Sequence, residues 1–464
     1  MNKDFATVEQ SDVLIIGAGI SGLSSAMRLL ELAKEKNLPP PKITIVEADS
    51  EIGGRARSAF MNGYVIHPGA QWLHDSTSNP FYRWLSEQYA GLTFNEDCVN
   101  HGLIVTESGI KPPEFFEKLS VAFYEIQASV KEKEPQKDLS MAELSSMIED
   151  PDGARLAKFM AREWTGIQDP ANISSDEALS NGYNPGGPQI EQGTSSALEK
   201  MANDLKAQGV VIYTSTPVVG VRQTENELTL KSADGRLFQA FAGIITLSAG
   251  VLQKNTISFD PPISDEVARY MDNLVMGHMT KIIIPLDKSF LESRNIKPNT
   301  FVSIIKDDMT ILCHLYSMGA PIVTIFAGGA ASMAVENKSP VEIKEFIHQV
   351  FSQLGSYMEG YESATEGEPY VSKFTTNPFT CGAYSTVKAA AKRIDPVLQE
   401  KLIFSGEAFV VIDEHGKDPS GTMSAAWSAG RLAAQKALSL IMPELRSRRD
   451  ISAPQPRGRF PQPN

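Results

Sequence analysis

Residues 12–22, read as DVLIIGAGISG, constrain the fold of this chain more than any other segment. The short apolar run at 12–17 has no polar alternation, which predicts a buried parallel strand. Apolar residues at helical spacing then predict a helix from Ser21 to Lys36, closed by three prolines. A G-x-G-x-x-G turn lies between the two elements, and this is the context in which that motif binds a dinucleotide.

Each position of the turn requires glycine for a different physical reason. Gly17 allows the tight turn, Gly19 lets the backbone approach a phosphate, and Gly22 lets the helix pack on the strand. The free N–H groups and the positive end of the helix, at Ile20 and Ser21, favour a pyrophosphate.

The next strand, predicted at 43–47, ends in Glu47 and completes a βαβ unit. A carboxylate at this place accepts hydrogen bonds from both ribose hydroxyls and repels a 2′-phosphate. The sequence therefore predicts a dinucleotide site and disfavours NADP.

Elsewhere the chain alternates between helical and extended patterns, without an internal repeat. Helices are predicted at 115–133, 154–165, 196–208, 340–354 and 422–441. Strands are predicted within 210–233 and at 243–248, 279–286, 321–327 and 402–406. The Gly/Pro-rich stretch 181–193 is interpreted as a crossover loop, and residues 449–464, with four prolines, as a flexible tail.

The composition of the chain limits its binding partners, its location and the sites that its cysteines can form. The chain has 464 residues and a net charge of −13, which argues against nonspecific binding to nucleic acid. No apolar run is long enough to span a bilayer, and the first ten residues lack the apolar core of a secretory signal, so a cytoplasmic location is expected. Cys98, Cys313 and Cys381 lack C-x-x-C spacing, so neither a disulfide framework nor a metal site is predicted.

The choice between NAD and FAD depends on the segment after Glu47. Gly53 and Gly54 bring the backbone close to a ligand, and Arg55 offers a fork of donors to phosphate or flavin. With the glycine turn, this segment resembles the flavin-containing amine oxidase family. The resemblance continues through Gly69–His74 with Asn79-Pro80, Gly277–Lys281, Pro378–Ser385, Phe404–Glu407 and Ser420–Gly430. The segment around Trp72 and His74 is most similar to polyamine oxidases.

The resemblance implies a set of FAD contacts. Pyrophosphate and ribose would be held by the glycine turn, Glu47, Ala48, Gly53, Gly54 and Arg55. The isoalloxazine would lie against Gly69, Ala70, Gln71 and Trp72, and the backbone of Val218 would meet adenine. Gly406 and Glu407 would bind the ribityl or phosphate region, and Thr422 and Met423 would begin a helix whose N-terminus stabilises reduced flavin.

The resemblance also implies three catalytic residues. Lys281 would hydrogen-bond flavin N5 through a water, His74 would face the substrate amine, and Tyr384 would form one wall of an aromatic cage. The other wall is Thr422, so the cage is half aromatic.

Some residues depart from the family pattern. His67 stands where an acidic residue is usual, and Phe374 where a tryptophan is common. Ala383 occupies the position of the cysteine that binds flavin covalently in monoamine oxidases, which implies noncovalent FAD. Glu163 is a candidate partner for a distal ammonium group, although a solvated helix carboxylate is the favoured interpretation.

Together these features predict an α/β fold with a Rossmann-type, three-layer FAD-binding domain and a second α+β substrate-binding domain, as in amine oxidases. We expect residues 1–80, 200–290 and 395–448 in the first domain, and 81–199 and 291–394 in the second. The expected function is an FAD-dependent amine oxidase of the polyamine oxidase type, with an amine or polyamine substrate, dioxygen as acceptor and hydrogen peroxide as product. An L-amino-acid or other amine oxidase, a flavin-dependent desaturase or porphyrinogen oxidase, and a non-catalytic flavoprotein scaffold remain as alternatives.

Overall fold

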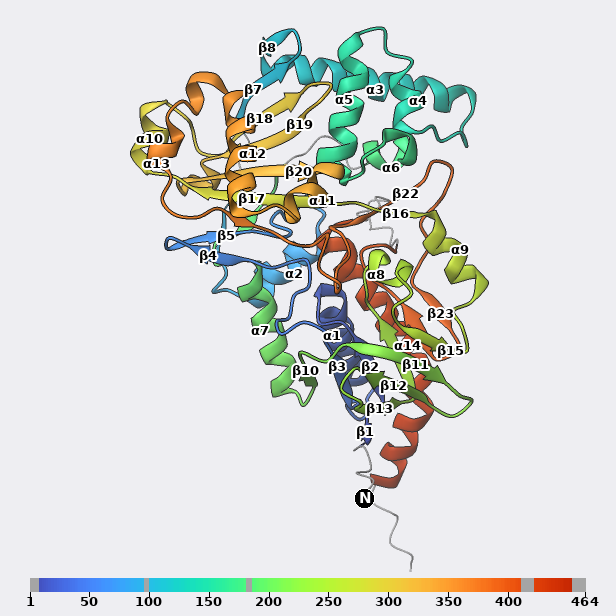
Figure 1. The fold of residues 1–464 in the computed structure, drawn as a ribbon. Coiled ribbons are helices and arrows are strands. Elements are labelled where there is room, and N and C mark those ends of the chain that lie inside the picture. Colours follow the sequence, from blue (N-terminus) through green and yellow to red (C-terminus); the bar gives the residue numbers. More distant parts are fainter. Residues whose placement is uncertain (1–7, 96–99, 181–185, 410–420, 453–464) are drawn as a thin grey trace, which may run out of the picture.

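A computed structural model describes residues 8–95, 100–180, 186–409 and 421–452, and every structural statement below concerns these ranges. The molecule has two lobes (Figure 1). The lower lobe in that view holds the N-terminal strands and the last helix, and the upper lobe holds a large twisted sheet with helices around it.

The lower lobe is built on a six-stranded sheet. Its order is β10 (Val211–Tyr213), β3 (Ile43–Val46), β2 (Val13–Ile16), β14 (Ala242–Ile245), β24 (Leu402–Phe404) and β23 (Val397–Gln399). The first five strands are parallel, and β23 is antiparallel to β24. The central strands β2 and β14 are buried throughout, as their continuous apolar runs require.

The two faces of this sheet are covered differently. Val13 and Ile15 pack in one core with α1 (Ile20–Glu35), α2 (Pro80–Gln88), α7 (Thr194–Ala207) and α14 (Met423–Ser452). Leu14 and Ile16 pack in another with a five-stranded sheet, β1 (Val8–Gln10), β13 (Leu237–Ala240), β12 (Leu228–Ser232), β11 (Val218–Gln223) and β15 (Ser258–Asp260). The helix α9 (Asp265–Asn273) joins that second core, and α8 (Ala249–Gln253) precedes β15. The lobe therefore has three layers.

The upper lobe is built on a seven-stranded sheet. Its order is β21 (Tyr370–Val371), β17 (Met279–Pro285), β20 (Ile322–Gly328), β19 (Thr310–Leu315), β18 (Thr300–Ile305), β7 (Asn100–Thr106) and β8 (Gly109–Lys111). In Figure 1, α10 (Lys288–Ser293), α12 (Pro340–Ser352) and α13 (Tyr361–Ala364) lie on the left of this lobe. On the right lie α3 (Pro113–Lys133), α4 (Met141–Ser145), α5 (Pro151–Phe159) and α6 (Ser175–Ser180). The short helix α11 (Ala330–Glu336) follows β20.

Three two-stranded ribbons complete the described structure. They are β4 (Ala59–Met61) with β5 (Tyr64–Ile66), β6 (Phe94–Asn95) with β9 (Gln189–Ile190), and β16 (Leu274–Met276) with β22 (Ser385–Val387). The strand β9 falls inside the segment predicted as a crossover loop, because its two residues pair with β6. Residues 181–185 of that predicted loop, Cys98 and residues 453–464 lie outside the described ranges.

The last helix is longer than the sequence predicts. It was expected to end at Ile441, but α14 continues through Pro443 to Ser452. Leu445 is fully buried, and Arg448 forms an ion pair with the buried carboxylate of Asp12, so tertiary contacts hold the final turns. Residues 449–452, predicted as part of the tail, are therefore helical.

Sheet membership also bears on the predicted domains. The strand β17 lies inside the seven-stranded sheet of the upper lobe, whereas the predicted boundary at 290 assigns it to the first domain. Likewise, Phe81 and Leu85 of α2 pack in the core of the lower lobe. On this criterion we propose boundaries near residues 95 and 277 in place of 80 and 290.

Candidate functional site

A cavity of about 790 Å³ extends from the glycine turn of the lower lobe to the seven-stranded sheet of the upper lobe. Its walls come from segments far apart in the chain, from Ile16 to Ala426. Pockets that hold organic ligands have volumes of roughly 300–1,000 Å³, so the cavity can hold a large cofactor and part of a substrate.

The predicted site residues are brought together at this cavity with one exception. The lining includes Gly17, Gly19, Ile20, Ser21, Glu47, Ala48, Gly53, Gly54, Arg55, Gly69, Ala70, Gln71, Trp72, His74, Val218, Lys281, Tyr384, Gly406, Glu407, Thr422 and Met423. The exception is Gly22, where an added Cβ would lie 2.0 Å from the carbonyl oxygen of Gly17. Its role is therefore the close contact between helix and strand, as predicted for the third glycine.

The glycine turn and the start of α1 line the cavity. Gly17 has a φ of +107°, a conformation that favours glycine. Gly19 is the N-cap of α1, and this helix start has neither a side-chain cap nor an acidic residue in its first turn. The first N–H groups of a helix have no partner within the helix, so this end suits an anionic group.

Glu47 is fixed at the end of β3 by the backbone. One of its carboxylate oxygens accepts a hydrogen bond from Ala18 N at 2.7 Å and the other from Asp49 N at 2.9 Å. Burial raises the pKa of Glu47 above its ordinary value. Each oxygen keeps a further lone pair, so the carboxylate can still accept from a ribose hydroxyl.

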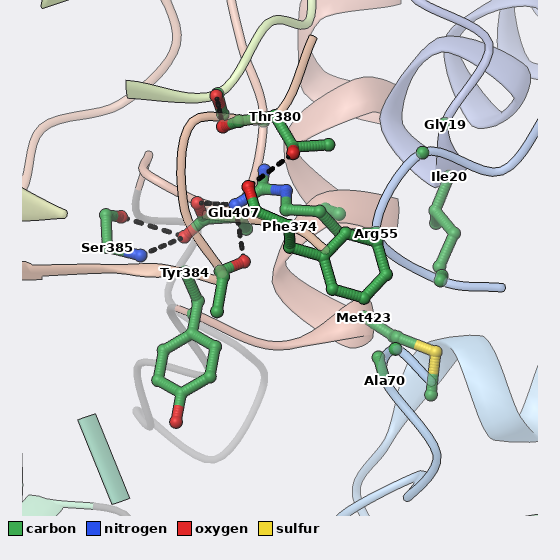
Figure 2. Close-up of a pocket in the computed structure, with 18 of the residues that line it drawn as sticks. Gly19, Ile20, Arg55, Ala70, Phe374, Thr380, Tyr384, Ser385, Glu407 and Met423 are labelled. Atoms are coloured by element: carbon green, nitrogen blue, oxygen red, sulfur yellow. Dashed lines mark hydrogen bonds and ion pairs between the residues drawn. The ribbon is translucent and has the colours of Figure 1, made fainter. Parts of the chain in front are cut away.

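A network of charged side chains crosses the middle of the cavity wall (Figure 2). Arg55 donates to Glu407 at 2.7 Å and to the carbonyl oxygen of Ala383 at 2.9 Å. Glu407 also accepts from the backbone and hydroxyl of Ser385. Burial alone would raise the pKa of Glu407, but Arg55 and Arg393 hold it below its ordinary value.

Arg393 is a member of this network that the sequence did not indicate. It is buried, forms an ion pair with Glu177 at 2.6 Å, and donates to the hydroxyl and the carbonyl oxygen of Ser385. It holds the start of β22 at Ser385, directly after Tyr384. No motif surrounds it in the sequence, and only its contacts in the folded chain show its role.

Lys281 lies on β17 and is buried. Its amine donates to the backbone oxygens of His67 at 2.9 Å and Gly69 at 2.7 Å, and to the side-chain oxygen of Gln71. The amine also lies 5.6 Å from the ring centroid of Trp72 and 5.0 Å from that of Phe326. Burial lowers the pKa of Lys281 to about 7, so the lysine can exchange a proton near neutral pH. The water-mediated contact with flavin N5 remains a prediction.

Tyr384 and His74 are oriented by backbone oxygens. The hydroxyl of Tyr384 donates to the carbonyl oxygen of Trp164 at 2.6 Å, which leaves the ring on the cavity wall. Nδ1 of His74 lies 2.9 Å from the carbonyl oxygen of Gly186, so it carries the proton and leaves Nε2 as an acceptor when the ring is neutral. Burial lowers the pKa of His74, which favours this neutral form.

The position of Glu163 differs from the one that we expected from the sequence. We expected a solvated helix carboxylate, but the side chain is 4% exposed and lines the cavity. The reason is local: α5 passes into a π-helical turn, Met160–Trp164, which directs Glu163 inward. One carboxylate oxygen accepts from Thr310 at 3.4 Å, and the other has no partner among the described residues. Burial raises the pKa of Glu163 well above its ordinary value.

These observations fit a flavin dinucleotide. The glycine turn and the start of α1 provide donors for a pyrophosphate, Glu47 is placed for a ribose, and Lys281 and Trp72 lie at the far end of the same cavity. Residues 20–438 match the family described as flavin containing amine oxidoreductase. The chain belongs to this family. It is an FAD-dependent amine oxidase, and the FAD is bound noncovalently, since Ala383 has no nucleophile at the position of the linking cysteine.

Individual relatives agree with this assignment. The chain is 26% identical to "Probable polyamine oxidase 4" of Arabidopsis thaliana over 463 residues, covering 91% of this chain and 86% of the relative. It is also 26% identical to polyamine oxidase 5 of Oryza sativa subsp. japonica, covering 91% and 87% of the two chains. A solved structure of putrescine oxidase bound to putrescine superposes with a TM-score of 0.73 at 17% identity, covering 93% of this chain and all of that one. The structural likeness establishes the amine-oxidase fold.

Within the described ranges, no helix combines the length and apolar character needed to cross a bilayer. The same ranges contain no cluster of three or more His, Cys, Asp or Glu side chains arranged to hold a metal ion.

Proposed function

We propose that this amine oxidase acts on di- or polyamines, with dioxygen as the acceptor and hydrogen peroxide as a product. The observation that carries the proposal is Glu163, a buried carboxylate on the cavity wall with one oxygen unpartnered among the described residues. The charge of Arg162 and the backbone of Gly328 offset the burial of Glu163 only in part, since its pKa stays well above the ordinary value. A substrate ammonium group would supply the direct ionic partner that a buried carboxylate needs. The relatives named as polyamine oxidases support the same substrate class.

The residues of the lower lobe would hold the cofactor. The start of α1 would bind the pyrophosphate, Glu47 the ribose, and Arg55 with Glu407 the ribityl or phosphate region. The segment Gly69–Trp72 would lie along the isoalloxazine, and the start of α14 would face its far end. Bound FAD supplies a two-electron acceptor, so the protein needs only to position and desolvate the amine.

Three side chains would act on the substrate end. Tyr384 would align the amine against its ring, since aromatic faces attract amines. Nε2 of His74 would accept a hydrogen bond from the amine and so orient its nitrogen. Lys281, with its lowered pKa, would hold the water that meets flavin N5 and take part in proton movement there. Transfer of a hydride from the neutral amine to the bound FAD would give an iminium, which water would hydrolyse to an aldehyde and a smaller amine.

The alternative of an L-amino-acid oxidase requires a cation for the substrate carboxylate. Among the described residues that line the cavity, Arg55 is the one arginine, and it already pairs with Glu407 and Ala383. Lys281 is directed to carbonyl oxygens and Gln71. The site therefore favours a substrate with cationic groups over one with a carboxylate.

The test is anaerobic reduction of the bound FAD by an amine panel. The panel comprises spermine, spermidine, their acetylated forms, putrescine, a monoamine and L-amino acids, followed by admission of oxygen and a peroxide assay. We expect the flavin colour to bleach fastest with di- or polyamines and peroxide to form on reoxidation. Bleaching by amino acids alone would contradict the substrate class, and no bleaching by any amine would favour a non-catalytic scaffold. We also propose a cytoplasmic location, to be checked by microscopy of the tagged chain.

A further inference from the structure

A second, much smaller cavity lies beside the first. Its volume is about 10 Å³, and its walls come from the end of β5 and from the strands β17 and β20. The lining residues are Val65, Ile66, His67, Gln71, Ile283, Ser317, Ile322 and Thr324. A cavity of roughly 10–15 Å³ holds one water molecule when polar groups surround it, and an imidazole, an amide and two hydroxyl side chains do so here.

His67 lines this cavity, and its buried ring needs hydrogen-bond partners. The residue is 6% exposed, and neither ring nitrogen has a hydrogen-bond partner among the described residues. The titratable groups that face it are Lys281 from β17 and His314 from β19. Burial and the nearby Lys281 lower the pKa of His67 to about 3, so the ring is neutral, with one donor and one acceptor nitrogen.

Gln71 separates the two cavities and lines both. On one side its amide oxygen accepts from the Lys281 amine. Its amide nitrogen donates to Gln189, at a long distance of 3.5 Å. The orientation of this amide therefore decides whether Lys281 meets an oxygen or an N–H group.

We propose that the small cavity holds one ordered water that bridges the His67 ring and the Gln71 amide, and that His67 thereby acts as a positioning residue for Lys281. The water gives the His67 ring a partner and holds the amide with its oxygen towards the lysine. The backbone oxygen of His67 accepts from the same amine, so one residue restrains Lys281 from two sides. The kinetic part of this inference rests on the role proposed for Lys281.

The first test does not depend on a substrate. A crystal structure of the FAD-loaded full chain, at a resolution that orders internal water, should show one water at about 2.7–3.2 Å from a His67 ring nitrogen and from the Gln71 amide. A cavity without water, or a water that contacts neither residue, would overturn the inference. This result is independent of whether any polyamine is oxidised.

The second test compares His67→Leu with His67→Asn in the FAD-loaded protein. Small misplacements of catalytic groups cost up to about a hundredfold in rate, so we expect the Leu variant to reduce FAD roughly tenfold to a hundredfold more slowly. In the Leu variant, the pH profile of the reduction rate should shift, and KM should change less than kcat. The Asn variant should recover most of the lost rate. His348→Leu, at an exposed histidine on α12, is the control.

An FAD-loaded Leu variant with the wild-type rate and pH profile would overturn the inference. If that variant fails to fold, Thr324→Val removes one hydroxyl from the same cavity wall with little change of shape. It should produce a smaller shift of the pH profile in the same direction, and no shift would again count against the water. Absence of FAD reduction by any amine in the wild type would instead contradict the proposed function.

Discussion

Arg55 and Glu407 form an ion pair of 2.7 Å, although the two residues are 352 positions apart in the chain. Arg55 follows the nucleotide-binding βαβ unit, and Glu407 follows β24 at the other end of the sequence. Arg393 adds a second positive charge near Glu407, through their shared contact Ser385. The pair therefore joins the two ends of the FAD-binding lobe at the cavity wall (Figure 2).

Replacement of Glu407 by Gln should weaken both the fold and the cofactor site. Removing one partner of a buried ion pair costs about 3 kcal/mol or more, because the remaining charge stays desolvated. Denaturant unfolding of the FAD-free protein and fluorescence titration with FAD measure the two effects. Glu35→Gln is the control, since its pair with Arg28 is half exposed and should be worth no more than about 1 kcal/mol. Equal losses in the two variants would contradict the prediction.

Replacement of Gly22 by Ala should destabilise the lower lobe. The new Cβ would lie 2.0 Å from Gly17 O, so α1 would have to move away from β2. Overpacking of this kind costs roughly 1–3 kcal/mol, and the displaced turn should also bind FAD less tightly. Melting temperature and FAD content are the measurements. Gly91→Ala, where the added methyl meets nothing within 4 Å, should leave both unchanged.

Because of Lys281, the free energy of unfolding should rise with pH between about pH 7 and 10. Burial lowers its pKa from 10.5 to about 7 in the folded chain, whereas the unfolded chain keeps its proton up to the ordinary value. Between these two pH values the unfolded state binds more protons, so stability rises with pH through that window. The stability of the FAD-free wild type relative to Lys281→Met should therefore increase from pH 7 to 10. A difference that does not change with pH would contradict the lowered pKa.

The same Lys281→Met variant tests the catalytic role. We expect a marked loss of rate in FAD reduction, in reoxidation by dioxygen, or in both, because the group that orients water near N5 is removed. Stopped-flow absorbance of the flavin separates the two half-reactions. Unchanged rates in both would remove Lys281 from the mechanism.

Glu163→Gln should discriminate between amines by charge. A hydrogen bond to a charged group contributes roughly 1.5–3 kcal/mol, so KM for a di- or polyamine should rise about tenfold or more. A monoamine should be affected much less. In the wild type, polyamine binding should weaken as pH falls through the pKa of Glu163, which burial raises. Glu368→Gln, at an exposed carboxylate, is the control. Equal effects on all amines would assign Glu163 a structural role.

The sequence alone predicted the elements whose local residue pattern agrees with the final fold. The strand β2, the glycine turn and α1 were predicted within one or two residues, because a buried run, a special turn and a helical period are all local signals. The residues assigned by family resemblance, including Lys281 and Glu407, line one cavity. Their roles towards FAD and substrate remain predictions.

The features that the sequence did not predict depend on tertiary contacts. Glu163 lies inward because one π-helical turn changes the helix phase, which residue spacing does not encode. Arg393 belongs to the site through side-chain contacts with Glu177 and Ser385, without a motif. The helix α14 passes Pro443 because Leu445 and Arg448 are held by the lower lobe.

The walls of the large cavity have a consequence for how the protein is made in the cell. They include Gly17, directly after β2, and Met423 at the start of α14, so the site is complete only when α14 has left the ribosome. FAD loading is therefore expected after translation, and nascent chains that stop before α14 should fail to retain the cofactor.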